Sequence, residues 1–172
     1  INTYTAEALS KILRDYGEEK FAWRIAQNIV ATREKHPVTT TWELVDIVKA
    51  SIPAAARREG GHPAKSTFQA VRLEVNGELE SLQKALEAGF AYLNPGGRFA
   101  VITFHSLEDR MVKQAFAAYC KGCTCPPDFP VCVCHKTPRA KLVTRKPLTA
   151  GREELEQNSR AKSAKLRVLE KL

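Results

Sequence analysis

The residues of this chain best suited to chemistry lie in one short polar segment, Phe104-His-Ser-Leu-Glu-Asp-Arg110. A Pro-Gly-Gly turn and an apolar, β-branched run at 98–104 come before it, and this pattern is typical of a buried strand. Open α/β sheets bind their ligands in a crevice at the carboxyl ends of the strands. The segment therefore predicts reactive groups in such a crevice. The alternative is structural: His105 and Ser106 only cap the next helix, while Glu108 and Asp109 pair with Arg110.

A second polar cluster, at 60–72, joins a Gly-Gly-His-Pro loop to the start of a helix. The positive end of that helix, near Lys65 and Thr67, could meet a phosphate. The alternative interpretation, without a binding role, is a linker that carries a surface histidine, His62. Asn76, further along the helix, is equally ambiguous, because its amide could bond a backbone group instead of a ligand. Together the two clusters suggest half of an active site.

Four of the five cysteines form two Cys-x-Cys pairs separated by six residues: Cys123, Cys125, Cys132 and Cys134. Four thiolates can bind one zinc ion in a closed, structural site. Disulfides paired across a hairpin and free thiols on an exposed loop are the alternatives. The odd cysteine count and the lack of a secretion signal favour a reducing cytosol over an extracellular disulfide scaffold. We therefore expect a cytoplasmic protein.

The chain is basic, with a formal net charge of +8, and residues 139–172 hold ten Lys or Arg against four Glu. This excess of positive charge favours a polyanionic partner, and nucleic acid is the polyanion that we expect first. An ordinary solvated surface is the alternative. No stretch reaches the ~18 apolar residues that a membrane span needs, so we expect no membrane partner. Since the sequence does not begin with Met, we expect a fragment.

Apolar residues spaced by three and four indicate short amphipathic helices through residues 1–52. Thr5 is the expected cap of the first helix, and Thr40 with Glu43 has the spacing of a capping box. A basic, Gly-rich connector follows. We therefore predict a helical subdomain at 1–60.

The rest of the chain, 61–172, indicates mixed helix and strand. Capping-box spacing at Ser66 and Gln69, and again at Ser106 and Asp109, predicts two helix starts. The first helix is expected to run to residue 93, weakened at Gly77, and to lead through a turn into the αβ half of a parallel unit. The predicted fold class is α/β. Further expected features are a Cys-rich loop at 120–135, strands at 141–145 and 166–169, and a short helix near 151–157.

Several long strings in this sequence resemble the RsmH (MraW) family of S-adenosyl-L-methionine-dependent methyltransferases. They are His62-Pro-Ala-Lys-Ser-Thr-Phe-Gln-Ala-Val-Arg72, Asn76-x-Glu78-Leu79, Pro95-Gly-Gly-Arg98, Phe104-His-Ser-Leu-Glu-Asp-Arg110 and Asn158-Ser-Arg-Ala-Lys-Ser-Ala-Lys-Leu-Arg167. The family methylates the N4 amino group of a cytidine in small-subunit ribosomal RNA. The resemblance implies the carboxyl half of a Rossmann-like class I methyltransferase sheet, preceded by part of an inserted helical subdomain at 1–60.

The resemblance also implies roles for individual residues. His105 and Ser106 become catalytic candidates at a base flipped into the pocket. The implied substrate-binding residues are His62, Lys65, Thr67, Arg72, Asn76, Phe104, Arg110, Arg160 and Lys162. Basic residues of the tail, which we expect to contact phosphates, are Arg139, Lys141, Arg145, Lys146, Arg160, Lys162, Lys165 and Arg167.

The family's first half carries a Gly-rich cofactor loop, an acidic residue for the ribose and an Asp-Leu-Gly-Val-Ser-Ser motif, and this sequence has none of them. We therefore expect no cofactor-binding residue in this chain, and the fragment alone to be inactive. An incomplete sheet would leave an open strand edge, which makes a homodimer plausible. The alternative function is a non-catalytic, basic RNA-binding module.

Overall fold

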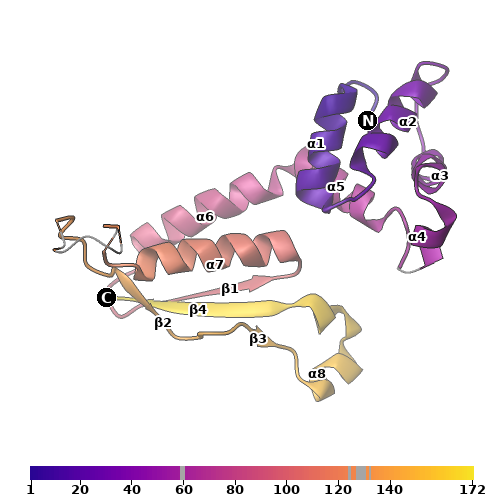
Figure 1. Ribbon diagram of the computed structural model, residues 1–172. Helices are drawn as coiled ribbons and strands as arrows, with labels where there is room; N and C mark the ends of the chain where they lie inside the picture. Colours follow the sequence, from indigo (N-terminus) through magenta and orange to yellow (C-terminus); the bar gives the residue numbers. More distant parts are fainter. Residues whose placement is uncertain (59–60, 124, 127–130, 132) are drawn as a thin grey trace. The chain divides into compact units, whose positions relative to one another are not determined.

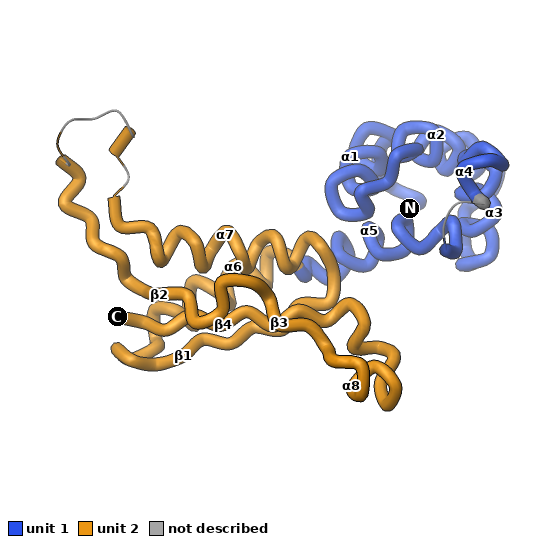
Figure 2. The backbone as a smooth tube through the Cα atoms, turned by 60° about the horizontal axis from the view of Figure 1, so that its bottom comes forward, with its two compact units in different colours: residues 1–78 blue, residues 79–172 orange. Residues whose placement is uncertain are grey.

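The computed structural model describes residues 1–58, 61–123, 125–126, 131 and 133–172. The chain divides into two compact units, Ile1–Glu78 and Leu79–Leu172, which Figure 2 colours blue and orange. No helix of the described residues is long and apolar enough to cross a bilayer.

The first unit is helical, as predicted (Figure 1). Its helices enclose one apolar core, in which Leu13, Ile25, Ile29 and Val48 are fully buried. The helices of this unit are α1 (Ala6–Gly17), α2 (Ala22–Arg33), α3 (Thr41–Ser51), α4 (Ala54–Arg58) and α5 (Lys65–Asn76).

Two of the predicted helix caps in this unit are confirmed. Thr5 Oγ1 accepts a hydrogen bond from the Ala8 amide at 3.2 Å, and Thr40 and Glu43 form a complete capping box. The predicted box at Ser66 and Gln69 is wrong. Helix α5 already begins at Lys65, and the Gln69 amide donates to the Tyr16 carbonyl instead, at 3.4 Å.

Gly17 lets the end of α1 lie directly on α5. A Cβ atom at this position would be 2.8 Å from the Ser66 carbonyl oxygen, too close for any other side chain. Because α5 packs on α1, the compact unit extends to Glu78, beyond the subdomain end predicted at residue 60. Whether residues 1–60 are an insertion in a methyltransferase domain stays a prediction.

The long helix predicted to run to residue 93 is interrupted. Gly77 adopts a left-handed backbone conformation, with φ of 59°, and ends α5; α6 (Glu78–Tyr92) then begins. Glycine reaches this region without the steric cost that a Cβ atom brings. The other elements of the second unit are β1 (Arg98–Thr103), α7 (Ser106–Cys120), β2 (Ala140–Leu142), β3 (Leu148–Thr149), α8 (Arg152–Gln157), the 3₁₀ helix η1 (Ser159–Ser163) and β4 (Lys165–Lys171).

The strands form a small sheet in which β4 lies between β1 and β2 and also pairs with β3. Helices α6 and α7 cover one face (Figure 1), where Phe90, Phe116 and Leu169 belong to one buried cluster. Mixed helix and strand is confirmed, and the strand pairs among the described residues are all antiparallel. Strand β4 runs back along β1, in a register from Arg98–Glu170 to Thr103–Lys165. That β1 belongs to the αβ half of a parallel, Rossmann-like unit stays a prediction.

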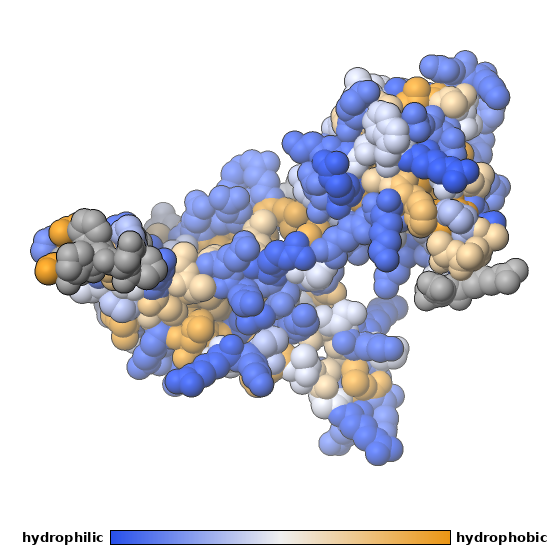
Figure 3. Space-filling model, viewed as in Figure 1, coloured by the Kyte–Doolittle hydropathy of each residue, from blue (hydrophilic) through white to orange (hydrophobic). Residues whose placement is uncertain are grey.

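The outer face and edge of the sheet keep apolar side chains in solvent. Ile102 and Leu148 are 58 % and 56 % exposed, although hydrophilic residues cover most of the surface visible in Figure 3. Within the described part of the chain, β1 pairs with β4 alone. This open edge fits the predicted homodimer, which stays a prediction.

An ion pair between α7 and β4 stabilises the second unit. Arg167 Nε and Nη2 donate to the two carboxylate oxygens of Asp109 at 2.7 and 3.1 Å, and Lys165 Nζ donates to one of them at 3.4 Å. Asp109 and Arg167 are both largely buried. The phosphate role predicted for Arg167 is therefore wrong, because its guanidinium is buried against Asp109.

The Arg167 hydrogen bonds lower the pKa of Asp109, against the opposing effect of burial. A lowered pKa means that the pair contributes its full stability above the pKa of the unfolded aspartate, about 3.9. That contribution is lost as the pH falls through the folded value.

We expect Asp109→Asn to lower the free energy of unfolding by about 3 kcal/mol at pH 7, because it leaves the buried Arg167 without a counter-charge. Urea unfolding followed by circular dichroism measures this loss. The difference from the wild type should begin to shrink as the pH falls below about 4, and it should vanish only below the lowered folded pKa of Asp109, where its carboxyl is neutral like the Asn amide. The matched control is Glu156→Gln, which removes an exposed partner of Arg152 and should cost less than about 0.5 kcal/mol. Equal effects of the two substitutions would contradict the prediction.

Candidate active site

A capping box holds the turn between β1 and α7. It begins one residue before the predicted position. His105, not Ser106, is the N-cap of α7: its Nδ1 accepts from the Glu108 amide at 3.4 Å. Glu108 Oε2 in return accepts from the amides of Phe104 and His105, at 2.8 and 3.2 Å. The predicted Ser106–Asp109 cap is wrong because Asp109 instead binds Arg167.

The cap sets the hydrogen-bonding role of the His105 ring. Because Nδ1 accepts a hydrogen bond, the neutral ring carries its proton on Nε2. Nε2 is buried and makes no hydrogen bond among the described residues, although it lies 3.3 Å from Glu108 Oε1. The two atoms do not meet hydrogen-bond geometry. His105 is thus both a helix cap and a hydrogen-bond donor whose Nε2–H has no acceptor among the described residues.

The residues around His105 are more accessible. Phe104 is 58 % exposed, and Ser106 and Arg110 are exposed at the start of α7. Thr103, the last residue of β1, is buried, and its hydroxyl donates to the Lys165 carbonyl at 3.3 Å. The buried end of β1 thus fixes the backbone from which the exposed aromatic ring projects.

Two of the predicted residues lie exposed before or at the start of α5, and a third is buried. His62 Nδ1 accepts from the Ala64 amide at 3.3 Å, and Lys65 is the first residue of the helix. Thr67 is fully buried, and its hydroxyl has no hydrogen-bond partner among the described residues. Since Thr67 has no access to a ligand in this structure, it is not part of the candidate site.

Arg72 and Asn76 both bind the carboxylate of Glu78. Arg72 donates from Nε and Nη2 at 2.9 and 3.0 Å, and the Asn76 amide donates at 2.9 Å. Asn76 thus bonds a side chain, and not the backbone group considered for it, while the substrate roles of both residues stay predictions. The Arg72 side chain is 55 % exposed, so it also stays accessible to solvent.

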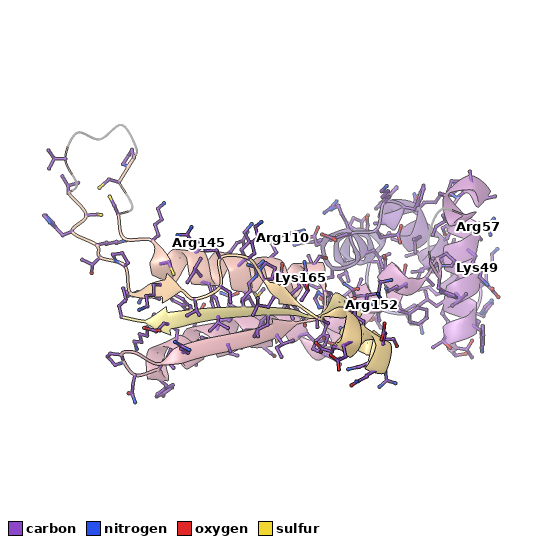
Figure 4. The ribbon with its side chains drawn as sticks, turned by 90° about the horizontal axis from the view of Figure 1, so that it is seen from below. Lys49, Arg57, Arg110, Arg145, Arg152 and Lys165 are labelled. Carbon is purple, nitrogen blue, oxygen red and sulfur yellow. The ribbon has the colours of Figure 1, made fainter. Side chains whose placement is uncertain are left out.

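Some cations of the basic tail contact a carboxylate or an aromatic ring, and others are exposed. Lys141 pairs with Glu170 at 2.7 Å, and the Arg139 guanidinium lies over the rings of Phe90 and Tyr119. Four others are exposed and form no ion pair within the described part of the chain: Arg145, Lys146, Arg160 and Lys162. In Figure 4, Arg110, Arg145 and Lys165 project from α7, the segment after β2, and β4.

The structure brings three of the four predicted metal ligands together. The sulfur atoms of Cys123, Cys125 and Cys134 all lie within 4.8 Å of one another. The fourth, Cys132, lies outside the described residues.

Sequence reasoning missed the organising roles of Glu108, Arg167 and Glu78. The spacing His105-x-x-Glu108 carried a signal for the first, since it is that of a capping box with histidine in place of the usual Ser or Thr. Arg167 acts through Asp109, a distant partner that no local pattern specifies. Glu78 bonds the nearby Arg72 and Asn76, so its signal was local but was not recognised.

The chain has clear relatives among known proteins. The family model described as "MraW methylase family" matches residues 1–172. The Ribosomal RNA small subunit methyltransferase H of Symbiobacterium thermophilum is 57% identical over all of this chain and 54% of its own length. The protein of the same name from Heliobacterium modesticaldum is 60% identical over 95% of this chain and 52% of its own length.

The chain spans about half the length of the curated relatives it matches. The family match, by contrast, extends over every part of the chain described above, from α1 to β4. The chain belongs to the MraW methylase family.

Proposed function

We propose that this chain is part of an S-adenosyl-L-methionine-dependent methyltransferase that modifies the N4 amino group of a cytidine in small-subunit ribosomal RNA. The observation that carries the proposal is the family match over all 172 residues, together with relatives named ribosomal RNA small subunit methyltransferase H. A cytoplasmic setting follows from the proposed substrate.

The cofactor would supply an activated methyl group on a sulfonium sulfur. The residues of this chain do not fit its binding by themselves, because the sequence has no Gly-x-Gly-x-x-Gly loop. Its Gly96-Gly97 pair lies at the turn before β1. Since the chain spans about half of its relatives, we propose that sequence beyond these 172 residues binds the cofactor, and that this chain positions the substrate.

Methyl transfer to a conjugated amino group depends on positioning and exclusion of water more than on strong acid–base catalysis. The exposed Phe104 ring offers a stacking face for a flipped base. His105 Nε2 carries a proton but is buried in this structure. Donation to the ring nitrogen or carbonyl oxygen of cytosine therefore requires a rearrangement that exposes Nε2, and Nε2 cannot accept from the amino group. The Ser106 hydroxyl can accept from that group. The amino group, ring nitrogen and carbonyl oxygen lie on one edge of cytosine. His105 and Ser106 can therefore recognise this edge together while Phe104 stacks on the face of the base.

Substituting His105 by Asn separates the capping role from the substrate role. Asn is a good N-cap residue, so the helix start is retained while the Nε2 donor is lost. We expect the longer protein that contains this chain to methylate small-subunit RNA, and His105→Asn to slow single-turnover methylation at least tenfold. Thermal stability and S-adenosylmethionine binding, measured on the same protein, should stay near those of the wild type.

His105→Ala and Thr5→Asn complete the comparison. His105→Ala should lose both the cap, worth about 1 kcal/mol, and the methylation rate. Thr5→Asn changes a cap in the first unit and should leave methylation unchanged. Normal turnover in His105→Asn would show that His105 acts only as a cap. RNA binding by the wild type with no methyl transfer at all would support the non-catalytic binding module.

Arg160 and Lys162 are the proposed phosphate contacts in the tail. Both are exposed in η1, whose start is capped by Asn158: its Oδ1 accepts from the Arg160 amide at 3.2 Å. The buried Ala161 anchors the same turn. Two cations on an anchored turn can meet successive phosphates with little further ordering of the backbone.

Replacing both Arg160 and Lys162 by Ala should weaken RNA binding and reduce the slope of log K against log salt by about one to two, because two phosphate contacts are lost. Titration of the longer protein with a small-subunit RNA fragment at several salt concentrations measures this slope. The charge-matched control replaces Lys84 and Arg152, which already pair with Glu80 and Glu156. If both double variants changed the slope equally, only net charge would matter.

A further inference from the structure

The loop that carries the cysteines leaves the fold at α7 and returns to it at β2, with its two ends held side by side. The Arg139 amide donates to the Tyr119 carbonyl at 3.0 Å. Gly122 lies against Pro138 so closely that a Cβ atom would come within 2.8 Å of the proline Cδ. The base of the loop is thus fixed by one backbone hydrogen bond and by the packing of Gly122 on the Pro138 ring, and the cysteines lie beyond this base.

One sulfur–sulfur distance in the cluster matches that of thiolates that share one tetrahedral ion. Cys123 Sγ and Cys134 Sγ are 3.7 Å apart. Tetrahedral zinc, with Zn–S bonds of about 2.3 Å, requires sulfur atoms about 3.8 Å apart. A disulfide would need about 2.05 Å, and the described cysteines form none.

The local backbone supports a thiolate at Cys123. The amide of Cys125 donates to Cys123 Sγ at 3.3 Å, and an N–H donor of this kind stabilises a metal-bound sulfur. The cluster consists of thiols alone, without a carboxylate or imidazole among the described residues. A sulfur-only, tetrahedral set of ligands favours zinc over hard cations such as Mg²⁺ or Ca²⁺.

We propose that Cys123, Cys125 and Cys134 bind one zinc ion in a structural site that fixes the loop between α7 and β2. This proposal goes beyond the proposed methyltransferase function and does not depend on it. A fourth ligand closes such a site. The fifteen residues of α7 separate the cluster from the His105 turn by about 20 Å, at 1.5 Å per residue. The zinc ion therefore takes no part in methyl transfer.

Metal analysis of the full chain tests the proposal directly. Protein purified under reducing conditions, loaded with zinc and dialysed, should retain about one zinc ion per chain by mass spectrometry. Cys123→Ser, Cys125→Ser and Cys134→Ser should each bind zinc at least tenfold more weakly in competition with a chromogenic chelator. Cobalt substitution provides a second readout, because thiolate-to-cobalt charge-transfer absorption should be strong in the wild type and reduced in each variant.

Cys120→Ser is the matched control. Cys120 is half-buried at the end of α7, outside the cluster, and burial raises the pKa of its thiol. This variant should keep its zinc. The proposal is overturned if the wild type retains no zinc, if the three cluster variants bind it as well as Cys120→Ser does, or if mass analysis without reductant shows a Cys123–Cys134 disulfide in place of the metal.

Discussion

The second unit depends on one charged contact, the bidentate pair between Asp109 and Arg167. Removing both charges from water carries a desolvation cost, and the fork geometry and the neighbouring Lys165 offset it. Removing one partner lowers the free energy of unfolding strongly, because the remaining charge stays buried without a counter-charge. Asp109 belongs to the first turn of α7, and Arg167 to the strand that pairs with β1. The pair therefore fixes both sides of the β1–α7 turn.

Within that turn, Glu108 holds the amides of Phe104 and His105, while His105 in return caps the helix. This reciprocal arrangement leaves the Phe104 ring in solvent and directs the proton of the neutral imidazole to Nε2. A site for a flipped base needs such features: a stacking face and a donor whose orientation is set before the base arrives. The chemistry proposed for the turn thus follows from its folding contacts.

Some local signals in the sequence predicted local structure correctly, although the capping boxes expected at Ser66 and Ser106 were wrong. The caps at Thr5 and Thr40, the strand that begins at Arg98 and the helix at 152–157 were predictable because each depends on residues only a few positions apart. The antiparallel sheet was not, since the strand that pairs with β1 lies about 70 residues further along the chain. Asp109 and Arg167 likewise belong to two separate motifs, and neither motif indicates that the other is its partner. The cysteine spacing allowed several states, and the 3.7 Å sulfur separation favours one of them.

Amide hydrogen exchange tests most directly whether the ion pair positions the turn. The amides of Phe104 and His105 bond to Glu108, just as those of Thr39 and Thr40 bond to Glu43 in the other unit. In Arg167→Gln, exchange at Phe104 and His105 should accelerate at least tenfold, while Thr39 and Thr40 keep their wild-type rates. Unchanged exchange at Phe104 and His105 in that variant would contradict the dependence of the site on the Asp109–Arg167 pair.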